Sequence, residues 1–165
     1  MVEERDGWFV TNVKDAGWTY TEAFGWACSF EDPENRFPEL GFHIFLLEPG
    51  KSNCRYHREG VQENFLVLSG ECTMLVNGEE RPLEAWDFVH CPAGVSHVFV
   101  GGGAGPCALL AVGKRPSKDV LHYPESELAR KYNAETPEAT GDPRVAYADV
   151  PPRQPCDAPD WPAGS

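Results

Sequence analysis

The chain has 165 residues and a formal net charge of −12 at pH 7, with 41% hydrophobic and 12% aromatic residues. This composition indicates a single folded domain and excludes an intrinsically disordered chain. The acidic charge, with no cluster of Lys or Arg, excludes nucleic acid and anionic membranes as partners, and no apolar run approaches the ~18 residues of a membrane span.

Six cysteines are spread along the chain and would form a disulfide framework in a secreted protein. Residues 1–6 do not form a basic segment followed by an apolar core, so we expect a cytoplasmic protein with reduced thiols. No two of the cysteines form the C-x-x-C pair of a zinc site, so we expect them to be small buried apolar side chains. Cys54 is a candidate to border a site, because it lies three residues before His57.

Short strands separated by turns account for the first part of the chain. Residues 7–29 combine aromatic, β-branched and glycine residues, which favours short strands that extend a sheet. The proline- and carboxylate-rich residues 31–40 predict a loop. Residues 40–47 form an apolar strand with His43 on one face. His43 is a candidate substrate contact, although a lone histidine on an apolar strand is more often a core group.

The next stretch carries alternating polar side chains. Arg55, His57 and Glu59 are spaced by two, so a strand would present all three to one cavity. Gly60 permits a turn, after which Glu63 begins the inward face of the following strand. This segment therefore predicts one side of a polar site.

Turn signals divide the residues that follow. Asn77-Gly78 predicts a tight hairpin, because a type I′ turn needs positive φ at both central positions. Residues 92–94 predict a turn that delivers His97 to the start of a strand. Asp87 is expected to cap a turn, and Trp86 to lie in the core or at an interface. Strands are expected at 83–91, 97–100 and 107–112.

The last fifty residues differ from the rest. Residues 120–133 have near-helical apolar spacing, with Ser126 and Pro124 as start signals and Asn133 as a stop, so one short helix is predicted. Residues 134–165 are rich in proline and either wrap the barrel in extended form or are partly disordered, and we favour wrapping. We divide the chain into a barrel at 1–116 and a helix and tail at 117–165, within one domain.

Two groups of residues resemble the signature motifs of the cupin superfamily. The first is His57-x-Glu59, three residues, Glu63, six residues and Gly70. The second is Pro92-x-Gly94, two residues and His97. The resemblance carries over a first histidine, a glutamate and a second-motif histidine at His57, Glu63 and His97. The chain departs from the motifs at three positions: Glu59 replaces a histidine, Trp86 a glycine and Gly101 an asparagine.

The resemblance implies an all-β fold. It selects the cupin jelly-roll (double-stranded β-helix) barrel, here with a short C-terminal helix and an extended Pro-rich tail. Small cupins commonly pair through barrel strands, so the resemblance also implies a homodimer. The expected partner is a small-molecule ligand, with no nucleic acid and no membrane.

The polar residues of the motifs suit a divalent metal. Two imidazoles and one carboxylate leave coordination positions open, which is typical of a site for chemistry. We therefore predict a metal bound by His57, Glu63 and His97: Fe, Mn or Zn, with Ni as a further option. Glu59 either binds as a fourth ligand, which would favour Fe or Mn, or points to solvent or pairs with Arg55 or Arg58.

Three functions follow from these residues. The favoured one is a metal-dependent enzyme acting on a small polar molecule, an oxygenase, isomerase or decarboxylase, with Glu63 or Glu59 moving a proton. His43, Arg55 and Gln62 are the candidate substrate-binding residues. The alternatives are a non-catalytic binding or sensor cupin and a structural barrel with a vestigial site.

Overall fold

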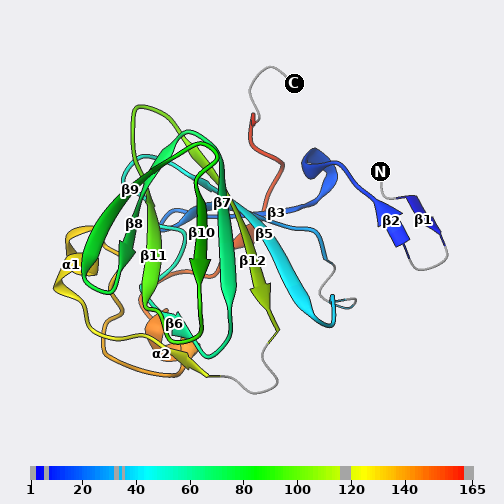
Figure 1. The fold of residues 1–165 in the computed structure, drawn as a ribbon. Coiled ribbons are helices and arrows are strands. Elements are labelled where there is room, and N and C mark those ends of the chain that lie inside the picture. Colours follow the sequence, from blue (N-terminus) through cyan, green and yellow to red (C-terminus); the bar gives the residue numbers. More distant parts are fainter. Residues whose placement is uncertain (1–2, 6–7, 32–33, 35, 116–119, 162–165) are drawn as a thin grey trace.

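The computed structural model describes residues 3–5, 8–31, 34, 36–115 and 120–161. Two antiparallel sheets lie against one another and enclose the core, which confirms the all-β architecture (Figure 1). The larger sheet has the order β10 (Phe88–Cys91), β7 (Glu63–Ser69), β12 (Cys107–Lys114), β5 (Leu40–Leu47), β4 (Gly25–Ser29), β3 (Gly17–Thr21) and β14 (Gln154–Pro155). The smaller sheet has the order β11 (His97–Gly101), β8 (Glu71–Val76) and β9 (Glu79–Glu84).

Three minor elements accompany the two sheets. A short hairpin of β1 (Glu3–Arg5) and β2 (Trp8–Val10) stands away from the barrel in Figure 1. The 3-10 helix η1 (Val13–Asp15) follows it, and β6 (Arg58–Glu59) pairs with β13 (Leu121–His122).

The core lies between the two sheets because inward side chains alternate along each strand. On β5, Phe45 and Leu47 face the cluster shared by both sheets, whereas Ile44 and Leu46 face a second cluster with Trp18. This confirms the alternation predicted for residues 40–47. The shared cluster of buried side chains includes Leu47, Phe65, Val67, Met74, Phe99 and Leu109.

The β8–β9 connection is the predicted hairpin, with φ of 47° at Asn77 and 84° at Gly78. The single strand expected at 83–91 is wrong, because a turn separates β9 from β10 and sends them to different sheets. At this turn Trp86 has φ 76° and is 74% exposed, so it is not a core residue. Asp87 caps the turn as predicted, since its Oδ2 accepts from the Glu84 backbone N–H at 2.9 Å.

The one short helix predicted within residues 120–133 forms, and the residues before its start signal include β13. Helix α1 (Glu127–Lys131) begins after Ser126, whose Oγ accepts from the Ala129 N–H at 3.1 Å, and ends before Asn133 at φ 54°. Both boundary signals are therefore confirmed. Among the described residues, no helix is long and apolar enough to cross a membrane.

The described part of the tail packs along the barrel in extended form, as favoured. Strand β14 pairs with β3, and the Trp161 indole N–H donates to Ser69 Oγ at 3.2 Å. Arg153 donates to the Gly25 carbonyl at 2.7 Å. A four-residue helix, α2 (Pro143–Ala146), interrupts the tail and was not predicted. The last four residues lie outside the described part of the chain.

Candidate metal centre

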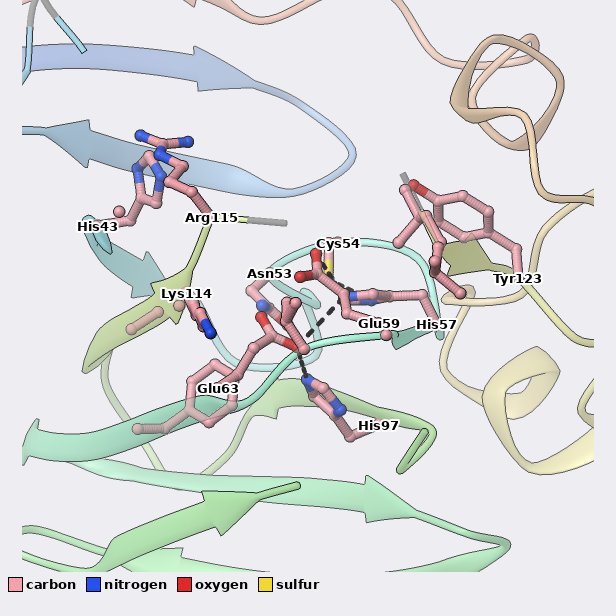
Figure 2. Close-up of a pocket in the computed structure, with 18 of the residues that line it drawn as sticks. His43, Asn53, Cys54, His57, Glu59, Glu63, His97, Lys114, Arg115 and Tyr123 are labelled. Carbon is pink, nitrogen blue, oxygen red and sulfur yellow. Dashed lines mark hydrogen bonds and ion pairs between the residues drawn. The ribbon is translucent and has the colours of Figure 1, made fainter. Parts of the chain in front are cut away.

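Figure 2 shows the polar side chains that converge in a cavity of about 330 Å³. Glu63 enters it from the start of β7 and His97 from the start of β11. His57 comes from the segment just before β6, and Glu59 from β6 itself. Both sheets therefore contribute to one polar site.

The two histidines are held side by side by their own backbones. The His57 N–H donates to the His97 carbonyl at 3.2 Å, and the His97 N–H donates to the His57 carbonyl at 2.8 Å. Their ring centroids lie 5.0 Å apart. The turn before His97 is fixed to the same segment, because the Gly94 N–H donates to the Glu59 carbonyl at 2.8 Å. A reciprocal backbone pair thus sets the spacing of the imidazoles.

Glu63 faces both imidazoles from the larger sheet. Its Oε2 lies 3.3 Å from His97 Nε2 and 4.0 Å from His57 Nε2. The candidate ligand atoms of His57, Glu63 and His97 all lie within 4.8 Å of one another. Three ligand atoms this close can contact one ion at the usual ligand distances of about 2.0–2.2 Å after small side-chain adjustments.

Backbone carbonyls orient both imidazoles toward the cavity. His57 Nδ1 lies 2.9 Å from the Arg55 carbonyl oxygen, and His97 Nδ1 lies 3.0 Å from that of Val95. An Nδ1–H donated to a carbonyl leaves Nε2 as the coordinating atom, as in many metal sites. His97 Nε2 is buried and has no hydrogen-bond partner among the described residues. The residues present therefore fit a divalent metal.

Protonation differs between the two histidines. Burial lowers the pKa of His57, and the neighbouring His97 lowers it further. Burial also lowers the pKa of His97, but the adjoining Cys91 thiol and Glu63 carboxylate outweigh burial and raise it to about 10. Burial raises the pKa of Glu63, yet the close contact with the His97 imidazole brings it below its ordinary value. In the metal-free protein, protonated His97 and ionised Glu63 form an ion pair.

Glu59 lies beside this group. Its Oε1 is 3.9 Å from His57 Nε2, and it is not among the three residues whose ligand atoms converge. Burial and the negative charge of Glu63 raise the pKa of Glu59 to about 7. At neutral pH, Glu59 is close to half protonated, which suits a group that exchanges protons.

Of the three residues predicted to contact the substrate, one lines the cavity and two do not. His43 lines the cavity. Gln62 is exposed and does not line it. Arg55 is also outside the lining, because the backbone before β6 is not the regular strand that the spacing of two assumed. Instead, the Arg55 guanidinium binds Asp149 at 2.7 and 2.8 Å and the carbonyl of Glu135.

Several lining residues were missed by the sequence analysis. They come from the segment between β5 and β6, the end of β12 and the C-terminal segment, and include Asn53, Lys114, Arg115, Tyr123 and Tyr147. Cys54, expected to border the site, does so, with its Sγ 3.5 Å from His57 Nδ1. The Tyr123 ring lies 5.9 Å from the His57 ring, so a residue 66 positions later forms the wall behind a candidate ligand.

Fold and site together define a double-sheet β protein with a candidate divalent-metal centre. Residues 43–113 match the family model described as Cupin domain. Over these residues the chain matches a cupin domain, which confirms the resemblance seen in its motifs. The matched residues include all three converging side chains.

Solved structures support the same fold. The polyketide cyclase RemF from Streptomyces resistomycificus is 18% identical, with 64% of this chain and 78% of that chain covered and a TM-score of 0.55. A predicted oxalate decarboxylase from Thermotoga maritima is 22% identical, with 65% and 99% covered and a TM-score of 0.55. At these identities the likeness establishes the cupin fold alone.

A further structure, from Acidithiobacillus ferrooxidans ATCC 23270, is 30% identical with a TM-score of 0.47. The match spans only about half of either chain, 50% of this one and 55% of the other. A comparison with curated protein sequences found no significant match.

Proposed function

We propose that the protein is a metal-dependent cupin enzyme that acts on a small polar molecule. His57, Glu63 and His97 hold one divalent ion, with Fe, Mn and Zn as the first candidates and Ni as a further one. One observation carries the proposal: ligand atoms of these residues lie within 4.8 Å of one another in a cavity.

The ion and the residues around it would each have a separate role in the reaction. A bound divalent metal supplies a Lewis acid that polarises an oxygen atom of the substrate. Glu59 lines the same cavity and accepts or returns a proton at the substrate. Apolar side chains, such as Phe45 and Phe65, exclude water from one wall. This arrangement favours proton transfer on a polarised substrate, a step shared by isomerisation and decarboxylation.

Metal analysis and turnover test the proposal. Protein purified without chelator should contain about one divalent ion per chain by mass spectrometry of the elements, and His57→Ala and His97→Ala should lose it. His90→Ala is the matched control, because His90 is exposed and its Nδ1 lies 2.8 Å from Asn64 Oδ1, outside the cavity lining.

Turnover is then measured on a panel of keto acids, sugars and hydroxy-aromatic compounds. Glu59→Gln should retain the metal and lose product formation. Oxygen consumption in place of proton transfer would assign the protein to the oxygenases. A metal-loaded protein that binds but never converts these compounds would be a sensor or binding cupin. A protein without metal would be a structural barrel.

We further propose a cytoplasmic homodimer. The described cysteines, at positions 28, 54, 72, 91, 107 and 156, are all free thiols, which suits a reducing compartment. Strand β10 is an edge of the larger sheet; its first residue, Phe88, is 65% exposed, and Trp86 just before it is 74% exposed. Sedimentation of the wild type should give a dimer at micromolar concentration, and Phe88→Asp a monomer. A monomeric wild type would contradict the assignment.

A further inference from the structure

We infer that the cavity binds a small carboxylate anion and that Lys114 selects for its negative charge. The inference rests on the proposed function, because the metal supplies part of the charge of the site. Lys114 lines the cavity at the end of β12 and is exposed to solvent there. It belongs neither to the candidate ligands nor to the substrate contacts predicted from the sequence.

When the cavity holds a divalent ion, the positive charge of Lys114 is left without a negative partner among the described residues. Among the described residues, the carboxylates that line it are Glu59 and Glu63. Their two negative charges balance one divalent ion, and neutral imidazoles add none. Lys114 makes no ion pair within the described ranges, whereas Arg115 pairs with Glu31. An anionic ligand would therefore neutralise the site, and a neutral one would leave it positive.

The backbone fixes the base of the Lys114 side chain next to the candidate metal. Gly113 is the β12 residue paired with Glu63, and the Lys114 N–H donates to the Gln62 carbonyl at 3.1 Å. Figure 2 shows the Lys114 amine on the Glu63 side of the cavity. A carboxylate bound between the ion and this amine could meet both at once.

The polar groups near Lys114 are also donors. Asn53 Oδ1 accepts from the Phe99 N–H at 2.9 Å, which leaves the amide NH₂ of Asn53 to the cavity that it lines. Arg115 lines the same wall, and its Nε is buried with no hydrogen-bond partner among the described residues. Asn53, Lys114 and Arg115 thus add hydrogen-bond donors to the lining of the cavity, and donors are what a bound carboxylate requires.

The size of the cavity restricts the anion. A volume of about 330 Å³ lies at the lower end of small-molecule pockets. Phe45, Phe65 and Ala111 give it an apolar wall that can cover a short carbon chain. The expected ligand is therefore a short carboxylic acid with a second oxygen atom able to reach the metal.

The test is calorimetric binding to Mn²⁺-loaded protein with three probes. Lactate carries the expected anion, lactamide is nearly the same molecule without the charge, and inorganic phosphate is a different small anion. Lactate should bind, and lactamide should bind at least about tenfold more weakly. Lys114→Met should weaken lactate binding about tenfold and leave lactamide binding unchanged, and Lys114→Arg should restore most of the lactate affinity.

Controls separate this inference from the proposed function. Lys131→Met removes an exposed lysine that does not line the cavity and should change nothing. Protein that takes up no Mn²⁺ refutes the metal centre. Full Mn²⁺ occupancy without lactate binding refutes only this inference, as does equal binding of lactate and lactamide. Unchanged lactate affinity in Lys114→Met refutes the role of Lys114 in binding the anion. Binding of phosphate but not lactate refutes a carboxylate as the ligand.

Discussion

Metal binding should release protons, and the number can be worked out from the four titratable groups of the site. The pKa of His97 is raised to about 10 in the metal-free protein, so at pH 7 this imidazole carries a proton that a metal must displace. The pKa of Glu59 is about 7, so Glu59 holds about half a proton at that pH. His57 and Glu63 have lowered pKa values and contribute none. A bound divalent ion also lowers the pKa of the neighbouring Glu59, so about 1.5 protons should leave per ion bound.

The same values set the pH dependence of affinity. At pH 7 the metal-binding form of His97 is present at about one part in a thousand, which costs about 4 kcal/mol of binding free energy relative to pH 10. Affinity should fall about tenfold per pH unit below 10 and more steeply below 7, where Glu59 also holds its proton. Metal affinity falls as the pH falls because protons compete with the metal for His97 and cancel the charge of Glu59.

Calorimetric titration of Mn²⁺ in buffers of different ionisation enthalpy measures the released protons directly. The wild type should release about 1.5 protons at pH 7, and Glu59→Gln should release about 1.0 because only His97 remains. His90→Ala should match the wild type. Release near zero in the wild type would refute the ion pair between His97 and Glu63, and equal release in Glu59→Gln would refute the raised pKa of Glu59.

Three further predictions concern stability. Phe99→Ala should lower the free energy of unfolding by about 4 kcal/mol in urea, because Phe99 is fully buried. Val10→Ala at an exposed position should change it little, and equal losses would contradict the assigned core. Gly101→Ala should cost about 2 kcal/mol, since a Cβ there collides with the Glu48 carbonyl oxygen, and a stable variant would refute that close approach. Arg55→Met should cost about 2 kcal/mol and leave metal content unchanged; metal loss at unchanged stability would return Arg55 to the site.

Local sequence signals predicted the barrel well. Strand β5 has its predicted alternation, the Asn77-Gly78 hairpin forms, and the cap at Ser126 begins α1. These features depend on a few neighbouring residues, so periodicity and turn chemistry are sufficient to predict them. The strand break at Trp86 was missed because a non-glycine residue adopts positive φ there, which its residue type does not favour.

The candidate site was predicted in part. His57, Glu63 and His97 come together as the motif spacing predicts, because the His57 and His97 backbones pair with each other and Glu63 faces them from the other sheet. The prediction that Arg55 faces the cavity was wrong, because a spacing of two gives a shared face only on a regular strand. The ion-pair partner of Arg55, Asp149, lies 94 positions away in the sequence. Tyr123 reaches the cavity through the pairing of β13 with β6, a long-range contact that no local pattern encodes.

The most direct test of the metal centre is a crystal structure with anomalous scattering measured at the iron, manganese, zinc and nickel edges. The account predicts one peak about 2.0–2.3 Å from His57 Nε2, His97 Nε2 and a Glu63 oxygen. A peak bound elsewhere would contradict the metal centre. So would crystals soaked with the metal in which His97 keeps its ion pair with Glu63 and no peak lies between the two residues.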